Sequence, residues 1–138
     1  MKNTKARSFV AIIVVIAVSA LILRIAIEQI TKINITQNES NAQAALKFIS
    51  AALENYAKDH LGAYPANFSA LVQDNPPYLD KDYLIESPIR GYDYNCPRIE
   101  TLGYSCSASP VKCNLTGRAT YAVTTGGLVI AEECGKKE

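Results

Sequence analysis

The hydrophobic pattern divides the chain into three stretches with different periods. From Phe9 to Ile30 only Arg24 and Glu28 are charged and most positions are apolar, which is typical of a membrane-spanning helix. From Asn38 to His60 apolar residues recur at steps of three and four, the period of an amphipathic helix. From residue 92 onward the period falls to two, as in half-buried strands.

The first two stretches are expected to form one helix. No Gly or Pro occurs between Met1 and Leu61, so nothing interrupts a helix there, and Gly62 is expected to end it. A helix from Phe9 to His60 would be about 78 Å long at about 1.5 Å per residue. Its second half carries an apolar stripe that needs a cover, made of Ala42, Ala45, Leu46, Ile49, Leu53 and Tyr56. Away from this stripe, Glu54 and Lys58 have the i,i+4 spacing of a favourable ion pair.

The alternating segments predict a small antiparallel sheet after an irregular connector. The expected strands are Tyr92–Cys96, Tyr104–Ala108, Ala119–Thr124 and Leu128–Ala131. Gly126 and Gly127 form the expected hairpin turn between the last two strands, and a short helix over 68–72 is expected behind Asn67 as its cap. The fold predicted is therefore α+β, a long N-terminal helix whose second half packs on the sheet.

Charge predicts how the chain meets a membrane. Lys2, Lys5 and Arg7 precede the apolar run, and a basic flank of this kind stays in the cytoplasm. We expect a leader over 1–8, a membrane-spanning or filament-core helix over 9–30, and an extracytoplasmic domain over 31–138. Beyond residue 30 there are ten Lys and Arg against twelve Asp and Glu, so no basic face is present and no nucleic-acid partner is predicted.

The apolar run alone fits three fates: a cleaved secretion signal, a plain membrane anchor, or the stem of an assembly. A small-x-small site at Val18-Ser19-Ala20 lies inside the hydrophobic stretch rather than after it, which disfavours ordinary signal cleavage. Arg24 and Glu28 are four residues apart. They could pair within one helix near the membrane boundary, which we favour, or between subunits inside a filament.

The cysteines predict two disulfides. Cys96, Cys106, Cys113 and Cys134 all lie in the last 43 residues, and their spacings contain no CxxC pair. An even number of cysteines in an exported segment favours disulfides, with three possible connectivities. The favoured one pairs Cys96 with Cys106 across a hairpin and Cys113 with Cys134, which ties down the C-terminus. With His60 as the single histidine, no metal site, cofactor or nucleophile–base pair is predicted, so we expect no enzyme.

Several ordered motifs carry a resemblance to a known family. The basic leader MKNTKARS precedes Phe9, and VVIAVSALIL follows in the apolar run. An alanine-rich helix end over 41–65, NAQAALKFISAALENYAKDHLGAYP, closes with Tyr64-Pro65. Together these resemble the type IV pilin superfamily, particularly the major pseudopilins of type II secretion systems. The likeness spans most of the chain and is strongest over 9–65.

The resemblance implies a subunit that polymerises through its N-terminal helix. A prepilin peptidase would cleave between Ser8 and Phe9, Phe9 would be N-methylated, and a cytoplasmic assembly ATPase would supply energy. The partners implied are copies of the chain itself, other pilin-like subunits and the inner membrane. Ser8 and Ile13 stand where the family has Gly and Glu. The segment 124–128 has no carboxylate, so the calcium loop of some pseudopilins is not expected.

Another class of function fits the same layout. A single-pass anchored module could present its extracytoplasmic domain to a ligand or partner and never polymerise. An anchored hydrolase has less support, because no catalytic constellation is visible in the sequence. The two leading hypotheses differ in where the mature chain begins.

Overall fold

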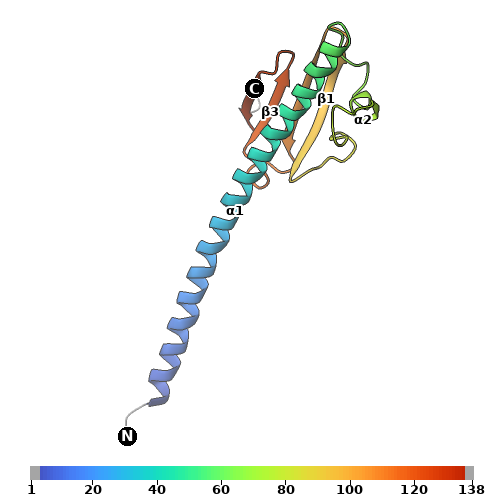
Figure 1. The fold of residues 1–138 in the computed structure, drawn as a ribbon. Helices are drawn as coiled ribbons and strands as arrows, with labels where there is room; N and C mark the ends of the chain where they lie inside the picture. Colours follow the sequence, from blue (N-terminus) through green and yellow to red (C-terminus); the bar gives the residue numbers. More distant parts are fainter. Residues whose placement is uncertain (1–3, 136–138) are drawn as a thin grey trace. The chain divides into compact units, whose positions relative to one another are not determined.

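The computed structural model describes the backbone of residues 4–135 and the side chains of residues 8–135. Its elements are α1 (Thr4–Asp59), α2 (Ala70–Gln73), β1 (Tyr92–Glu100), β2 (Gly103–Pro110), β3 (Ala119–Thr124) and β4 (Val129–Glu133) (Figure 1). The chain divides into two compact units, the first ending at Asn34 and the second beginning at Ile35. Each unit is described separately below.

Helix α1 is a single unbroken element, as its composition predicts, but it starts earlier than expected. It begins at Thr4 instead of Phe9 and ends at Asp59. The chain leaves the helix through two residues of positive φ, Leu61 at 58° and Gly62 at 90°, and the Gly62 N–H donates to Ala57 O at 2.7 Å. Gly62 therefore ends the helix as predicted, with Leu61 sharing the left-handed turn.

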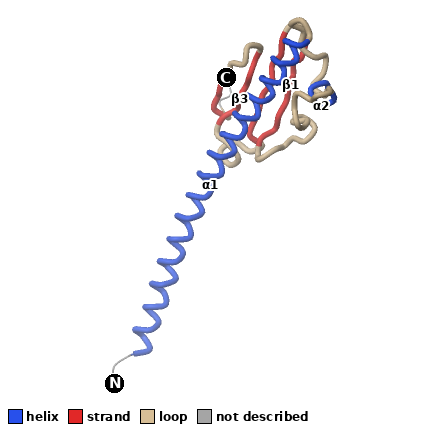
Figure 2. Tube along the Cα trace, viewed as in Figure 1, coloured by secondary structure: helices blue, strands red, loops and turns tan. Residues whose placement is uncertain are grey.

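The second unit is an α+β domain in which the C-terminal part of α1 packs on a four-stranded sheet, which confirms the predicted fold class. The strands follow chain order, β1-β2-β3-β4, and every neighbouring pair is antiparallel. Figure 2 shows the C-terminal part of α1 in blue lying along the red strands. The β3–β4 hairpin turns through Gly126 and Gly127 as expected, and the Gly127 N–H donates to Thr124 O at 2.9 Å.

The core lies between α1 and one face of this sheet. From the helix, Ala42, Leu46, Ile49 and Leu53 are fully inaccessible, so the predicted stripe is confirmed at its centre. Alternate side chains of strands β1, β2 and β3 are buried against the helix, as expected for half-buried strands. They are Tyr92, Tyr94, Tyr104, Cys106, Ala108, Tyr121 and Val123. The connector adds Phe68, Leu71, Leu79 and Tyr83 to the same cluster.

The bounds of three strands and of the short helix are corrected. Strands β1, β2 and β4 run four, two and two residues past the predicted ends, Cys96, Ala108 and Ala131, because antiparallel pairing continues beyond the alternating pattern. Strand β1 does so past a register shift after Asn95, and β4 begins at Val129 instead of Leu128. The short helix begins at Ala70, two residues later than predicted, although Asn67 still accepts the Ala70 N–H at 3.0 Å.

Candidate functional site

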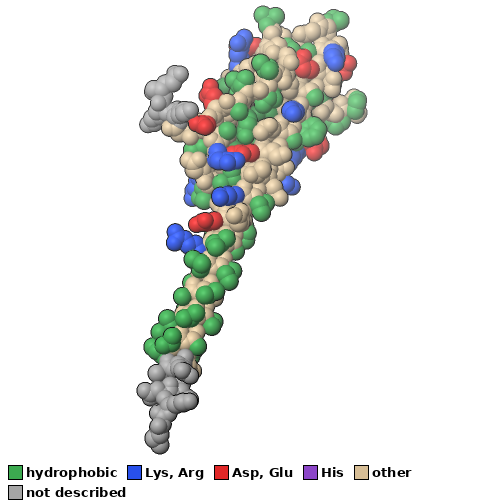
Figure 3. Space-filling view, turned by 90° about the vertical axis from the view of Figure 1, so that its left-hand side faces the viewer, with side chains coloured by type: hydrophobic (Ala, Val, Ile, Leu, Met, Phe, Trp, Pro, Cys, Tyr) green, Lys and Arg blue, Asp and Glu red, His purple; other side chains and the backbone are tan. Residues whose placement is uncertain are grey.

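The first unit offers an apolar helical surface that the chain itself does not cover. Every residue from Ser8 to Ile30 is exposed, including Phe9 at 65% and Leu23 at 62%. By length and composition this helix can cross a membrane, and none of its apolar window is buried. Hydrophobic side chains accordingly dominate the surface of this segment (Figure 3). A surface of this composition requires lipid or other protein around it.

The residues that the sequence associates with processing lie on this helix. Ser8 and Phe9 are both exposed and belong to α1, so the bond between them is helical in the uncleaved chain. Ile13 is 50% exposed among other aliphatic side chains. Of the expected leader, residues 1–3 lie outside the described part of the chain, and residues 4–8 form the first turn of the helix.

The two charges of the apolar segment face each other along the helix. Arg24 Nε lies 3.7 Å from Glu28 Oε1, and both side chains are mostly exposed. The structure therefore contains the intrahelical pair favoured from the spacing. The two charges cancel, so residues 9–30 carry no net charge. This reduces the free-energy cost of placing the segment in an apolar environment.

In the second unit, a carboxylate of α1 holds the loop before β3. Glu39 accepts three hydrogen bonds from Arg118: from the backbone N at 2.8 Å, from Nε at 3.3 Å and from Nη2 at 3.1 Å. Partial burial of Glu39 opposes its ionisation, but these bonds and the guanidinium charge together hold the pKa of the carboxyl below its usual value. Asn38, the residue before Glu39, donates from Nδ2 to Thr116 O at 3.0 Å. Two neighbouring side chains of α1 therefore bond the same loop.

A second carboxylate of α1, that of Glu54, bonds strand β2 and the β3–β4 turn. Glu54 Oε1 accepts from the Tyr104 hydroxyl at 3.0 Å and from the Gly126 N–H at 2.9 Å, and Oε2 accepts from the Tyr64 hydroxyl at 3.1 Å. The Tyr104 hydroxyl also lies 2.8 Å from Ser50 Oγ. Since its one proton goes to the carboxylate, the Ser50 hydroxyl donates to it. Burial raises the pKa of Tyr104 to about 12, with the Glu54 carboxylate adding to the rise, so the phenol remains a donor.

This arrangement corrects the sequence-based expectation for Glu54. The predicted pair with Lys58 does not form among the described residues, because the Glu54 carboxylate turns toward the sheet and is occupied by three donors. In the sequence, Glu39 and Glu54 both fall outside the apolar stripe of the helix. Their partners lie up to 79 residues away in the sequence, and no local spacing indicates them.

Two disulfides complete the frame of the domain. Cys96 is bonded to Cys106 between β1 and β2, and Cys113 to Cys134 between the loop after β2 and the end of β4. This is the connectivity favoured from the sequence. The second disulfide fixes the loop that carries Arg118, and Cys134 N also donates to Arg118 O at 2.9 Å. The loop before β3 therefore joins helix α1 to the C-terminal end of β4.

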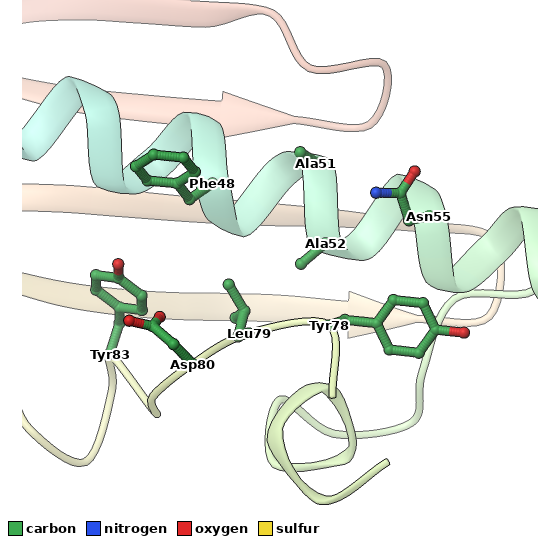
Figure 4. Close-up of a pocket in the computed structure, with 8 residues that line it drawn as sticks. All are labelled: Phe48, Ala51, Ala52, Asn55, Tyr78, Leu79, Asp80 and Tyr83. Carbon is green, nitrogen blue, oxygen red and sulfur yellow. The ribbon is translucent and has the colours of Figure 1, made fainter. Parts of the chain in front are cut away.

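A groove runs beside the exposed side of α1 in the same domain. One hollow of this groove, about 340 Å³, is lined by α1 and by the connector over 78–83. Phe48 and Tyr83 stand at one end, Asn55 and Tyr78 at the other, with alanines of α1 between them (Figure 4). Two further hollows, of about 160 and 330 Å³, continue the groove past Phe48 toward Arg90. Phe48 is 62% exposed, a high value for a phenylalanine beside a core.

The Tyr78 end of the groove is acidic. The Tyr78 hydroxyl donates to Asp59 Oδ2 at 2.7 Å, and this bond, with burial and the charges of Asp59 and Asp74, raises the pKa of Tyr78 to about 12. Asp80 also lines the groove, but it lies beside Tyr83 at the other end (Figure 4). At that end Lys81 lies 5.0 Å from the centre of the Tyr83 ring, and Lys81 and Arg90 line the adjoining hollow. The groove therefore combines aromatic side chains, alanines of α1 and charges of both signs.

Within residues 4–135 no group of three or more His, Cys, Asp and Glu side chains is placed to hold a metal ion. Comparison with known proteins adds no assignment: no protein-family model, no curated protein and no solved structure matches this chain. The two features that the structure offers for function are therefore the uncovered apolar helix and the surface of the domain.

Proposed function

We propose that this chain is a structural subunit of a type IV pilus or a type II secretion-like pseudopilus and that it polymerises through its N-terminal helix. One observation carries the proposal. Helix α1 is exposed and apolar from Phe9 to Ile30, and further along the same helix it forms one side of the core of an α+β domain that contains two disulfides. The motifs that resemble pilins lie on this helix, from the basic leader to Tyr64-Pro65.

In this proposal the precursor is a single-pass inner-membrane protein. Its basic N-terminus stays in the cytoplasm, and its domain lies in the periplasm, where disulfides form. A prepilin peptidase removes residues 1–8, and assembly moves the apolar segment from lipid into a bundle of the same segments. The ATPase that drives this step is a separate cytoplasmic protein. Copies of the chain, and other pilin-like subunits, are the partners.

The composition of the segment suits both environments. Ile, Val, Leu and Ala make up most of residues 9–30, and such side chains pack against neighbouring helices as well as against lipid. All backbone groups inside the segment are bonded within the helix, so transfer from lipid to protein breaks no backbone hydrogen bond. The Arg24–Glu28 pair moves with the helix as a neutral unit.

N-terminal mass spectrometry of native protein tests the proposal. The expected mature chain begins at Phe9 and carries an N-methyl group. An intact Met1 on all of the material would instead favour an anchored module that never polymerises, and a start beyond residue 20 would remove the stem. The variant Ser8→Gly gives a matched comparison, because the resemblance places Gly at this position; we expect faster processing than in the natural chain.

Electron microscopy provides a second readout. The protein should travel with filaments in sheared surface fractions or, for a pseudopilus, in filaments formed when the subunit is overproduced. Protein found only as membrane-bound monomers under both conditions would contradict polymerisation even if the leader is removed.

A further inference from the structure

Charges of alternating sign lie along one face of α1 at the C-terminal end of the apolar segment. Arg24, Glu28 and Lys32 are spaced four residues apart, so each lies about one turn beyond the last. A step of four residues turns by only about 40°, so the three side chains keep to one side of the helix. All three are exposed, and no other charged residue occurs between Ser8 and Lys32. We call Arg24, Glu28 and Lys32 the charge row.

The contact inside one copy leaves bonding capacity on both Arg24 and Glu28. Arg24 Nε lies 3.7 Å from Glu28 Oε1, which is longer than the N–H···O hydrogen bond of about 2.7 to 3.2 Å. A guanidinium carries several N–H donors, and a carboxylate accepts several hydrogen bonds. The two side chains are 82% and 62% exposed, so a group from outside the copy can reach either of them.

The surroundings of the helix decide whether these groups need a further partner. Arg24 lies about 22 Å along the helix from Phe9, and the hydrocarbon core of a bilayer is about 30 Å thick. In a lipid-anchored monomer the Arg24 side chain extends to the headgroups and water, as arginines near helix ends do. In a bundle of copies, protein replaces lipid and water, and a charge that has no opposite charge beside it destabilises the bundle.

The alternation of sign distinguishes the possible relative heights of two parallel copies. At equal height, each charge of the row faces the same charge on the neighbour. When one copy is displaced by four residues, about 6 Å, its Arg24 is level with Glu28 of the other copy and its Glu28 is level with Lys32. A displacement of eight residues brings Arg24 level with Lys32, which is again repulsive. Since like charges held side by side oppose association, the row favours a displacement of about one turn.

We propose that the charge row joins neighbouring copies of this chain in the assembly, with Arg24 of one copy bound to Glu28 of the next. Water and lipid headgroups satisfy each charge separately and require no order of sign. A second copy displaced by one turn carries the matching order along the whole row. The row therefore sets the relative height at which adjacent apolar helices pack. The inference rests on the proposed function, because it names the contact through which the polymer forms.

A zero-length crosslink tests this contact while every charge is kept. The variant Arg24→Lys places an amine at position 24, and dicyclohexylcarbodiimide, which enters membranes, condenses an amine with a carboxylate that touches it. The reaction is carried out on membranes and on filaments from cells that produce the full chain. The expected product is a dimer whose digest contains two peptides joined between position 24 of one copy and Glu28 of the other. A bond within one copy would instead give a single looped peptide.

Two sets of variants separate the pairing from membrane insertion. Glu28→Gln with Gln29→Glu, on the Arg24→Lys background, keeps the composition but turns the carboxylate about 100° around the helix, so the dimer yield should fall about tenfold or more. Glu28→Lys makes the row uniformly positive and should lower the yield of filaments by a similar factor. Reversing every sign, with Arg24→Glu, Glu28→Lys and Lys32→Glu, restores the alternation and should restore filaments. Equal removal of the leader in all variants verifies insertion.

The pairing would be refuted by the absence of a dimer, by a looped peptide alone, by an equal dimer yield after the carboxylate is moved, or by no recovery of filaments in the reversed row. Filaments of the Arg24→Lys chain that lack the adduct would leave the proposed function standing and refute the pairing. An adduct in membranes of cells that form no filaments would support the pairing and refute polymerisation.

Discussion

The carboxylate of Glu54 gives the sharpest test of how α1 is fixed to the sheet. Replacing Glu54 by Ala removes the acceptor of three hydrogen bonds, two from tyrosine hydroxyls and one from the Gly126 backbone. A hydrogen bond to a charged group contributes about 1.5 to 3 kcal/mol to stability. Tyr104 keeps its Ser50 partner, and the half-buried Tyr64 and exposed Gly126 can turn to water, so the losses do not add in full. We expect Glu54→Ala to lower the free energy of unfolding by about 2 to 4 kcal/mol.

For a domain of this size that loss corresponds to a fall in Tm of about 10 to 20 °C. The assay is thermal and urea unfolding of the full chain in detergent micelles. Near-UV circular dichroism is a suitable signal, since the chain has eight tyrosines and no tryptophan. Glu54→Gln keeps the shape and one carbonyl acceptor, so it should lose less than Glu54→Ala.

Two comparisons decide whether the reasoning is right. Lys58→Ala should change stability by less than about 0.5 kcal/mol, because Lys58 is exposed and is not the partner of Glu54. A double-mutant cycle of Glu54→Ala with Tyr104→Phe should give a coupling energy of about 1 to 2 kcal/mol. Equal losses for Lys58→Ala and Glu54→Ala, or a coupling near zero, would show that the helix-local ion pair operates and that the contact with the sheet does not.

Three further predictions concern the same domain. The folded-state pKa of Glu39 is lowered, so its contribution to stability is present above the unfolded pKa and is lost as the pH falls through the folded pKa. The difference in unfolding free energy between the natural chain and Glu39→Gln should therefore shrink toward zero in acid. Replacing both Cys113 and Cys134 by Ser opens a loop with a sequence separation of 21 and should cost about 3 kcal/mol in urea unfolding. Gly117→Ala places a methyl group against the ring and hydroxyl of the fully buried Tyr92 and should cost about 2 kcal/mol, whereas the fold should tolerate Gly117→Ala combined with Tyr92→Phe better.

The sequence predicts those parts of the fold that depend on neighbouring residues. The stripe from Ala42 to Leu53 repeats with the helical period, and the structure buries it, because side chains three and four apart share one face. The alternation in Tyr104, Cys106 and Ala108 likewise indicates which face of β2 is buried. The exposed apolar segment from Phe9 follows from composition alone. These features need no knowledge of the tertiary fold.

The polar contacts that fix α1 to the sheet join residues that are far apart in the sequence, so no local pattern predicts them. Glu39 meets Arg118 across 79 residues, and Glu54 meets Gly126 across 72. Both acids lie off the apolar stripe, where the pattern predicts solvent, and for Glu54 a cation at i+4 offers a simpler partner. Only the path of the chain through the sheet brings the loop before β3 and the β3–β4 turn to the helix. The groove beside Phe48 depends in the same way on where the connector returns to α1.

The two hypotheses for the whole chain differ in what surrounds the apolar segment. Lipid or neighbouring copies can each cover residues 9–30, so the exposure of this segment alone fits an anchor and a subunit equally. The motifs that resemble pilins, from the basic leader to Tyr64-Pro65, are what favour the subunit. A monomeric anchor predicts neither a mature chain that begins at Phe9 nor filaments. These two observations therefore discriminate between the hypotheses better than any measurement of exposure.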